Sequence, residues 1–514
     1  MSVIAGRPVA GDGEEFRAVD PATGTALEPA YRALSAPRIE EAVTAAATAF
    51  EVYRDTTPQQ RAAFLRTIAD NLDARRDALV ERALVETGLP EARLTGEVGR
   101  TSGQLRLMAD EVELGEHQGV RIDHAQPDRS PAPAPDLRLR SIPIGPVVVF
   151  GASNFPFAFS TAGGDTAAAL AAGCPVIVKA HNAHPGTAEL AAGAIADAVN
   201  SCGLPPGTFS LLYGVGNEIG EHLVAHPDVR GVGFTGSRAG GLALLRIAQA
   251  RPTPIPVYAE MSSINPVIVL PGRAKAVDEV AQGYLGSLTL GSGQFCTNPG
   301  LLFVPEEAAE LRTAIGAAVG ETRGQTMLTE PISDAYRDGV ARLDSIDVLG
   351  RGAEGDGPNA PAPVVAAVTT AQLRDTPGLA DEVFGAASLV VSYRDLEDVI
   401  DTLDLLEGQL TVSVHVEPSD HEALRTLLPT LEDLAGRIIV NAWPTGVEVT
   451  HAMVHGGPFP ATSDGRSTSV GTLAITRFQR PVSYQGLPED LLPQAIRDEN
   501  PYGLPRRVDG TLER

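Results

Sequence analysis

The chain has 514 residues, enough for two to four domains and more than one hydrophobic core. Its 65 Asp and Glu residues outnumber its 40 Lys and Arg residues, and the formal net charge is -25. Because a chain this acidic repels phosphate backbones and anionic membrane surfaces, we expect no nucleic-acid or membrane partner. The opening MSVIAGRPVAGDGEEF lacks the pattern of a signal peptide, and no apolar run approaches the roughly 20 residues of a membrane span, so we expect a cytoplasmic protein.

The predicted elements begin with helices. Between Ile39 and about Val85, apolar residues recur three and four positions apart, which predicts amphipathic helices. A further helix is predicted for LTGEVGRTSGQLRLMADEVELG, and the Pro-rich HAQPDRSPAPAPDLRLR after it predicts a connection or arm.

Strands and helices then alternate. The β-branched runs PVVVFGA, PVIVKA, FSLLYG, VRGVGFTG and PIPVYAEM are separated by helical stretches, which predicts a parallel sheet with crossover helices. From about Asn265 a second α/β series predicts a second domain, with the strands PVIVL, LLFVP, SLVVS, TVSVH and RIIVN. The final segment, QRPVSYQGLPEDLLPQ and beyond, has strand-like and Pro-rich pieces that suit a subunit contact.

Cysteine usage points to a reactive thiol. Cys174, Cys202 and Cys296 are an odd number without metal-like spacing, so we expect reduced thiols, no disulfide framework and no metal site. Cys296 lies in GSGQFCTNPG, where glycines and small polar residues predict an approachable nucleophile whose surroundings favour the thiolate. The alternative is a small buried cysteine.

Glu260 ends the apolar strand in VYAEMSSINPV. A desolvated carboxyl group has its pKa raised toward neutrality, which suits a general base. The alternative is a carboxylate that caps a helix or pairs with an arginine.

Three polar features follow other strands of the first series. Asn154, in GASNFPF, comes after the first strand, where a side-chain amide can donate to an oxyanion, although turn asparagines are common. Lys179 ends the next strand and could bind a hydroxyl or phosphate of a ligand. The turn from Gly236 to Gly241, which includes Ser237, leads into a helix and suits a pyrophosphate, but it is not a G-x-G-x-x-G fingerprint.

Taken in this order, Asn154, Lys179, the FTGS turn, Glu260 and Cys296 make the chain resemble the aldehyde dehydrogenase superfamily over nearly its whole length. The stretches GASNFPFAFSTAGGDTAAALAAGCPVIVKAHNAHPGT, EMSSINP and HGGPFPATSDGRSTSVGT are similar to one branch of it. That branch contains 2-oxoglutarate semialdehyde (2,5-dioxopentanoate) dehydrogenases and an NADP-dependent fatty aldehyde dehydrogenase. Ser262, Ser263 and Ile264 replace the glycines and lysine of the commoner motif after the glutamate.

The resemblance implies a fold and a reaction. The fold is α/β and aldehyde dehydrogenase-like, with a Rossmann-type cofactor domain (1–125 and 148–260), an α/β catalytic domain (261–470) and a small oligomerisation arm with the C-terminal tail (126–147 and 471–514). Cys296 would attack the aldehyde, Asn154 would hold the oxyanion, and Glu260 would activate the water that hydrolyses a thioester. The chain would assemble as a homodimer or homotetramer.

The resemblance also assigns a nicotinamide cofactor. EVFGA is similar to a later cofactor-contact motif, so Glu382 and Phe384 would contact the nicotinamide side. NAD-preferring members often carry a glutamate three residues after the lysine, where this chain has Asn182, with His181 beside it. We therefore expect NADP to be preferred and NAD to give some activity.

The substrate follows less directly. In the resemblance, the helix GRTSGQLRLMAD lines the substrate tunnel, and Thr101 and Gln104 suit a polar aldehyde whose carboxylate could pair with Arg100. Leu105 and Met108 would accept an alkyl chain or belong to the core. Aromatic residues that could wall the tunnel, or simply pack, are Phe155, Phe159 and Phe295. The hypotheses are therefore oxidation of 2-oxoglutarate semialdehyde, oxidation of medium or long aliphatic aldehydes, and, distantly, a catalytically silent binding protein on the same fold.

Overall fold

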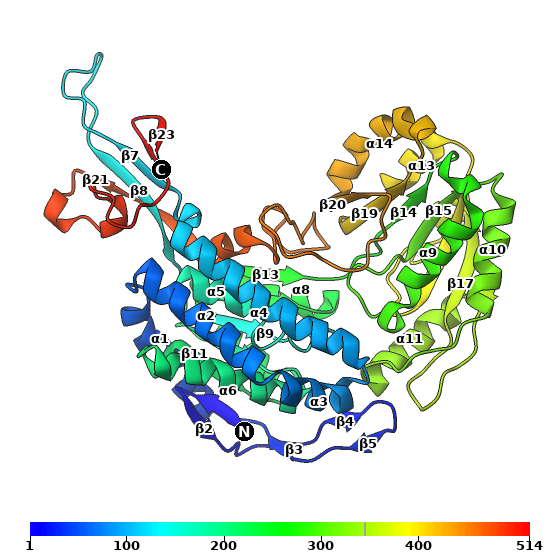
Figure 1. Ribbon diagram of the computed structural model, residues 1–514, viewed down its shortest axis with the longest axis horizontal. Coiled ribbons are helices and arrows are strands. Elements are labelled where there is room, and N and C mark those ends of the chain that lie inside the picture. Colours follow the sequence, from blue (N-terminus) through cyan, green and yellow to red (C-terminus); the bar gives the residue numbers. More distant parts are fainter. Residues whose placement is uncertain (344–345, 514) are drawn as a thin grey trace.

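The computed structural model describes residues 1–343 and 346–513. Two seven-stranded sheets lie in two lobes, and a third sheet projects from the first lobe as an arm (Figure 1). The N-terminus lies on the first lobe, and the C-terminus lies in the arm (Figure 1).

The first sheet has five parallel strands and an antiparallel edge, as the alternation predicts. In spatial order its strands are β13 (Val257–Glu260), β12 (Gly231–Thr235), β9 (Val147–Phe150), β10 (Val176–Lys179), β11 (Phe209–Leu212), β1 (Ser2–Ile4) and β2 (Arg7–Val9). The helices of this lobe are α1 (Ala36–Tyr53), α2 (Pro58–Ala74), α3 (Arg76–Thr87), α4 (Glu91–Leu114), α5 (Gly164–Ala172), α6 (Pro185–Ser201), α7 (Glu218–Ala225) and α8 (Arg238–Ala250).

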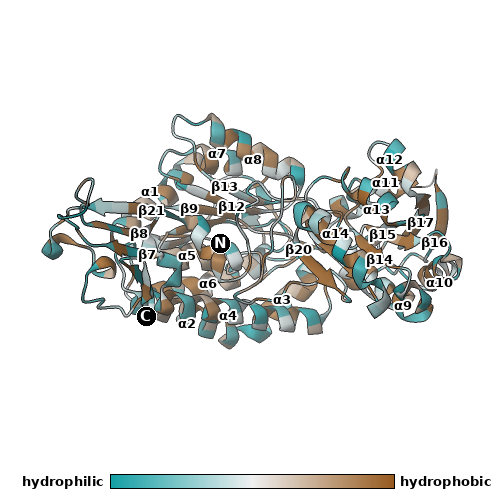
Figure 2. Ribbon diagram, turned by 90° about the horizontal axis from the view of Figure 1, so that it is seen from above, coloured by the Kyte–Doolittle hydropathy of each residue, from teal (hydrophilic) through white to brown (hydrophobic). Residues whose placement is uncertain are grey.

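Alternating residues of the parallel strands face two different cores. Val147 and Val149 pack with α2, α4, α5 and α6 on one face, whereas Val148 packs with α1, α7 and α8 on the other. A sheet covered by helices on both faces needs strands that are largely apolar, and the central strands VVVF, VIVK and FSLL contain only one lysine and one serine. Figure 2 shows the same contrast, with hydrophobic strands inside each lobe and hydrophilic outer helix faces.

The second sheet is parallel except at one edge, where β16 pairs antiparallel with β17. Its spatial order is β16 (Asp347–Arg351), β17 (Val364–Thr369), β18 (Ala387–Tyr393), β15 (Leu301–Pro305), β14 (Val267–Val269), β19 (Gln409–His415) and β20 (Ala435–Val440). Its helices are α9 (Val277–Thr289), α10 (Ala309–Gly320), α11 (Glu330–Leu343), α12 (Thr370–Asp375), α13 (Leu396–Leu403) and α14 (His421–Leu434).

The arm sheet joins residues 120–143 to the C-terminal part of the chain. Its order is β21 (Gln479–Gln485), β8 (Leu137–Pro143), β7 (Val120–Asp123), β22 (Arg506–Val508) and β23 (Thr511–Glu513), so β7 lies before the 126–147 segment predicted for the arm. Two small hairpin-like pairs complete the strands: β3 (Glu15–Phe16) with β6 (Tyr31–Arg32), and β4 (Val19–Asp20) with β5 (Thr25–Ala26). Within the described residues, no helix is both long and apolar enough to span a bilayer.

One segment ties the second lobe to the first. After β20 the chain returns to β13, where the N–H of Met261 donates to the carbonyl of Ala461 at 2.8 Å. Ser463 continues the contact, because its N–H donates to the Ala259 carbonyl at 2.9 Å. This return places residues 455–470, which the sequence assigned to the catalytic domain, against the edge strand that ends at Glu260.

Candidate active site

The predicted residues of the first lobe meet at the carboxyl edge of its sheet. The registers pair Lys179 with Phe150 and Thr235 with Glu260, so the ends of β9, β10, β12 and β13 are level. Asn154 follows β9, and Ser237 follows β12 and caps α8, accepting the N–H of Gly240 at 3.2 Å. Parallel sheets bind ligands at this edge, because helix N-termini and loops converge there.

Cys296 lies in a loop with an unusual backbone. Gly291, Ser292 and Gly293 all have positive φ, and a Cβ on Gly293 would lie 2.3 Å from the carbonyl carbon of Gly385. Glycine at 293 therefore allows the loop to pack directly against the strand end that follows Glu382. The side-chain amide of Asn265 donates to the Cys296 carbonyl at 2.8 Å and fixes the loop from the other side.

Three reactive groups from distant parts of the chain converge. The Sγ of Cys296 lies 3.4 Å from Nε2 of His455, and that nitrogen lies 2.9 Å from Oε1 of Glu260. Ser469 donates its hydroxyl to Oε2 of Glu260 at 2.9 Å. The thiol thus lies beside a carboxylate that can accept its proton, and Nε2 of His455 donates to that carboxylate.

The surroundings of Cys296 favour the thiol form. Burial and the neighbouring Glu260 carboxylate raise the pKa of Cys296 well above its usual value, and the charge of Arg437 opposes them only partly. The prediction that the loop favours the thiolate is therefore wrong, since the sequence could not show that a carboxylate lies beside the sulfur. A base is needed to deprotonate this thiol.

Glu260 also differs from its prediction. Burial raises its pKa, but the charge and hydrogen bond of His455, with the hydroxyl of Ser469, outweigh burial and lower the pKa below its ordinary value. Burial was predicted to dominate, and this is wrong because the compensating partners come from residues 455–469. Glu260 is therefore held as a carboxylate, which can accept a proton.

Asn154 is buried and directed at the nucleophile loop. Its side-chain amide donates to the backbone carbonyl of Gln294 at 3.1 Å. The backbone carbonyl of Asn154 accepts from Nη2 of Arg93 at 2.7 Å. The amide has a second N–H, and Asn154 lines the same cavity as Cys296 and Glu260. A donor beside the nucleophile is what an oxyanion site requires.

A cavity of about 860 Å³ joins this centre to the carboxyl edge of the sheet. Of the predicted cofactor-binding residues, the cavity is lined by Lys179, His181, Gly236, Ser237, Glu382 and Phe384. Asn182 lies just behind it and accepts a hydrogen bond from Nζ of Lys179 at 3.2 Å. Gly241 packs instead against Met261, whose Sδ would lie 2.7 Å from a Cβ at that glycine. The cavity is large and combines a helix N-terminus with a cation, which fits a dinucleotide.

Burial tunes the ionisable groups of this cavity. It lowers the pKa of Lys179 to about 8 and lowers that of His181 well below its ordinary value. Burial also raises the pKa of Glu382 to about 7, although a hydrogen bond with Ser262 opposes this. Lys179 is thus the cationic group at this end of the cavity near neutral pH.

The predicted substrate residues lie beside the thiol in two groups. Rings of Phe155, Phe159 and Phe295 form a cluster with centroid separations of 5.3 Å, and Phe159 is 5.9 Å from the His455 ring. The guanidinium of Arg100 lies 5.2 Å from the Phe159 centroid and donates to the Val447 carbonyl.

The other two predicted substrate residues are buried in α4. The hydroxyl of Thr101 donates to the Glu97 carbonyl of its own helix at 2.8 Å, which leaves it less free for a substrate. Nε2 of Gln104 is buried without a partner in the described structure. Leu105 and Met108 are fully enclosed in the first core, in agreement with the packing alternative.

Sequence reasoning missed His455, Ser469 and Arg93. His455 and Ser469 stand in the HGGPFPATSDGRSTSVGT stretch that carries part of the resemblance, and a single histidine there gave no sign of its partner. Arg93 is sandwiched between aromatic rings, with its guanidinium carbon 5.0 Å from the Phe155 centroid and 4.6 Å from that of Phe295.

Known proteins match both sequence and fold. Residues 9–458 match the model of the aldehyde dehydrogenase family. The alpha-ketoglutaric semialdehyde dehydrogenase 2 of Azospirillum brasilense is 51% identical over 518 residues, covering 99% of both chains. The alpha-ketoglutaric semialdehyde dehydrogenase of Acinetobacter baylyi is 47% identical, covering 92% of this chain and 91% of its own.

Solved structures agree in fold. A 3,6-anhydro-L-galactose dehydrogenase superposes with a TM-score of 0.80 at 22% identity, covering 94% of this chain and 99% of its own. A 1-pyrroline-5-carboxylate dehydrogenase also gives 0.80, at 21% identity and with 94% and 92% covered. The nucleophile, carboxylate and amide line one cavity, and the family model matches most of this chain. The chain therefore belongs to the aldehyde dehydrogenase family.

Proposed function

We propose that the protein oxidises 2-oxoglutarate semialdehyde to 2-oxoglutarate with NADP, through a thioester on Cys296. The observation that carries the reaction class is the convergence of Cys296, Glu260 and Asn154 on the cavity that also contains the cofactor-type residues. Support for the substrate is the similarity over the whole chain to two alpha-ketoglutaric semialdehyde dehydrogenases.

Addition to the aldehyde begins at Cys296. The thiol proton passes to the Glu260 carboxylate, and the sulfur forms a bond with the aldehyde carbon. Glu260 gives this proton up to solvent before hydrolysis begins. The oxyanion that develops is placed beside the side-chain amide of Asn154 and the backbone N–H of Cys296. When bound, the nicotinamide supplies a hydride acceptor, and loss of hydride from the adduct leaves the thioester.

Hydrolysis then releases the carboxylate. Glu260 accepts a proton from water, and the water oxygen attacks the thioester carbon. Sulfur leaves as the thiolate, and Cys296 recovers its proton from the protonated base. Ser469 fixes Oε2 of Glu260, so Oε1 stays directed toward the reacting groups.

The cofactor-binding residues support NADP over NAD. Lys179 is a buried cation at the cavity wall, and its neighbour Asn182 is neutral, so no carboxylate at that position opposes a 2′-phosphate. Ser237 and the N-terminus of α8 suit the pyrophosphate, and Glu382 would accept a hydrogen bond from the nicotinamide-side ribose.

Asn182→Glu tests the cofactor proposal. The new carboxylate would repel a 2′-phosphate, so we expect kcat/KM with NADP to fall by about 10-fold or more while the value with NAD changes little, a difference of about 1.4 kcal/mol or more. Initial rates with both cofactors measure this, with Asn182→Gln as the matched neutral control. An equal loss with both cofactors would contradict the role of this position.

A polar substrate is supported by the charge near the thiol. The charge of Arg100 interacts first with Glu97 and then with Cys296. Its Nη1 is buried without a partner in the described structure, so Arg100 is a candidate partner for the substrate carboxylate. The three phenylalanines beside it would also accept an alkyl chain, which keeps aliphatic aldehydes as the second candidate.

Initial rates of reduced-cofactor formation separate the candidates. We expect 2-oxoglutarate semialdehyde to give a much higher kcat/KM than decanal, and Cys296→Ala to be inactive with both. A higher value for decanal would replace the polar substrate with an aliphatic one. No turnover with either aldehyde and either cofactor would favour the silent binding protein instead.

We also infer a homodimer or homotetramer that assembles through the arm, in the cytoplasm. The arm sheet extends beyond the first lobe and ends in the short strand β23, all of whose residues are exposed (Figure 1). Light scattering on the full chain and on a variant truncated before β22 tests the assembly.

A further inference from the structure

The active centre contains the three donor types that bind thiophilic dications. A thiol from Cys296, an imidazole nitrogen from His455 and a carboxylate from Glu260 offer ligand atoms that all lie within 4.8 Å of one another. The residues come from three separate segments, so cysteine spacing could not indicate this site. Glu260 and His455 are buried, and Cys296 and Glu260 border the open cavity, which gives an ion a path of entry.

The spacing of these atoms agrees in part with that of a tetrahedral zinc site. Zinc bonds of about 2.3 Å to sulfur and about 2.0–2.2 Å to nitrogen and oxygen place neighbouring ligand atoms about 3.3–3.6 Å apart. The observed separations are 3.4 Å between Sγ and Nε2 and 2.9 Å between Nε2 and Oε1. The sulfur–nitrogen separation already lies in this range, a small outward shift of the carboxylate would bring the nitrogen–oxygen separation into it, and the third pair lies within 4.8 Å.

Surrounding contacts orient the carboxylate ligand and fix the backbone of the histidine ligand. Oε2 of Glu260 accepts from the Ser469 hydroxyl, which leaves Oε1 directed at His455. The backbone N–H of His455 donates to the hydroxyl of Thr468 at 2.9 Å, which fixes its segment. Outer contacts of this kind strengthen metal binding because they hold ligands in place.

The charges of these residues also favour binding of a dication. Cys296 and Glu260 would be two adjacent anions if both were ionised, and the Glu260 carboxylate opposes ionisation of the thiol. A dication between them cancels that repulsion, and the resulting thiolate–carboxylate–metal group has no net charge.

We propose that Cys296, His455 and Glu260 form an inhibitory binding site for a thiophilic dication of the Zn²⁺ and Cd²⁺ class. Binding forms metal–sulfur and metal–nitrogen bonds, releases the thiol proton and the Nε2 proton of His455 to solvent, and oxidises nothing. The ion occupies both the nucleophile and the carboxylate, so it blocks the reaction reversibly. The hard cation Mg²⁺ does not compete, since thiolate and imidazole are poor ligands for it. The site does not depend on which aldehyde is the substrate.

Cadmium titration of the purified full-length protein, without cofactor or aldehyde, tests the site directly. We expect one equivalent of Cd²⁺ to produce a thiolate-to-metal charge-transfer band in the ultraviolet, and a chelator to remove it. Cys296→Ser should abolish the band, whereas Cys202→Ser should leave it unchanged. A band that disappears in Cys202→Ser but persists in Cys296→Ser would overturn the proposal.

Two further variants separate a chelate from binding to a lone thiol. His455→Gln should lower the affinity for Cd²⁺ by at least about 10-fold. Ser469→Ala keeps all three ligands and should lower the affinity less. Equal affinity in His455→Gln and the unchanged protein would overturn the three-ligand site. Because the readout is absorbance, loss of the proposed dehydrogenase activity would not affect the result.

Discussion

At the residue scale, the central feature is a thiol whose environment opposes its ionisation. Burial and Glu260 raise the pKa of Cys296, yet His455 lies 3.4 Å from the sulfur. Chemistry at this sulfur therefore depends on transfer of the proton to a neighbour. The sequence identified the nucleophile and the carboxylate, but the imidazole comes from a segment that only the fold brings near.

His455→Gln tests that proton transfer. Without the imidazole, nothing at this position holds the pKa of Glu260 down, so the carboxylate is less available to accept the thiol proton. We therefore expect kcat/KM for the aldehyde to fall by about 10²-fold or more, and the pH at which kcat/KM rises to increase. The measurement is a pH profile of kcat/KM, with His421→Gln on exposed α14 as the control. An unchanged profile with full activity would show that His455 takes no part.

At the element scale, α4 positions two loops of the site at once. Arg93 binds the Asn154 carbonyl and lies between the rings of Phe155 and Phe295, next to Cys296. One turn later, Oε1 of Glu97 accepts the N–H groups of Phe157 at 2.9 Å and of Ala158 at 3.0 Å. The helix thus connects the oxyanion loop to the nucleophile loop.

Arg93→Met tests this positioning role. Loss of the guanidinium would release both loops, and misplacement of reacting groups by about 1 Å can cost about 10²-fold, so we expect kcat to fall by up to this factor with little change in the cofactor KM. The loss should be non-additive with Asn154→Ala, because Arg93 acts through Asn154. Exogenous guanidinium should restore part of the rate. Additive losses without rescue would indicate a structural role only. The matched control is Arg425→Met, because Arg425 is exposed.

The hydrophobic periodicity of the sequence predicts helices and strands better than it predicts the tertiary contacts of their side chains. It correctly gave α4 and the alternating strands, and strand ends located Asn154, Lys179 and Glu260. It could not distinguish a tunnel-lining residue from one packed inward, and Thr101 donates to its own helix. It also could not show that residues 455–470 return to β13, because that contact is set by tertiary packing.

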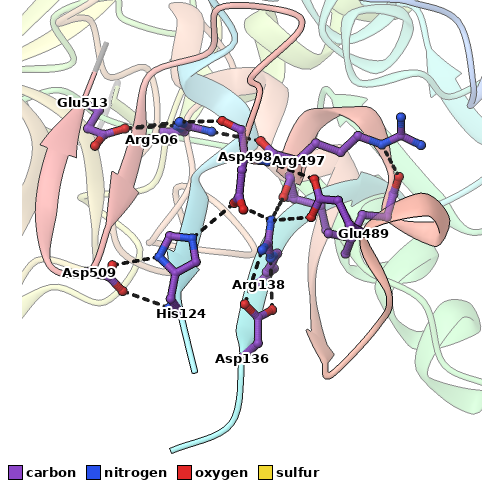
Figure 3. Close-up of polar contacts among 11 residues, drawn as sticks. His124, Asp136, Arg138, Glu489, Arg497, Asp498, Arg506, Asp509 and Glu513 are labelled. Atoms are coloured by element: carbon purple, nitrogen blue, oxygen red, sulfur yellow. Dashed lines mark hydrogen bonds and ion pairs between the residues drawn. The ribbon is translucent and has the colours of Figure 1, made fainter. Parts of the chain in front are cut away.

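At the scale of the whole molecule, a polar network fastens the C-terminal tail to the arm. Nδ1 of His124 lies 2.8 Å from Asp509, and Nε2 lies 3.2 Å from Asp498 (Figure 3). Nη1 of Arg138 donates to Asp498 at 2.8 Å, and Nε donates to Asp136 at 3.0 Å (Figure 3). Sequence composition predicted an arm, but not that this histidine would join its strands to the tail.

This network makes tail attachment depend on pH. The hydrogen bond with Asp509 is the main cause that raises the pKa of His124, and Asp498 adds to it. A raised folded-state pKa means that the stabilisation is complete below about pH 6.5 and is lost as pH rises through the folded value. We therefore expect hydrogen exchange of residues 486–513 to be slower at about pH 6 than at about pH 8, after correction for the intrinsic rate. His124→Gln should remove that difference. A protein whose tail protection is the same at both values would contradict the role of His124.

The central claim, oxidation through a thioester on Cys296, is tested most directly by trapping that intermediate. Glu260→Gln removes the carboxylate that raises the pKa of Cys296, so the thiol can still ionise and add to the aldehyde. Mixed with 2-oxoglutarate semialdehyde and NADP, this variant should form up to one equivalent of NADPH rapidly and then stall, because hydrolysis lacks its base. Intact-protein mass spectrometry after acid quenching should show the added acyl group, and peptide mapping should place it on Cys296. A burst without an adduct, or an adduct on Cys174 or Cys202, would contradict the account.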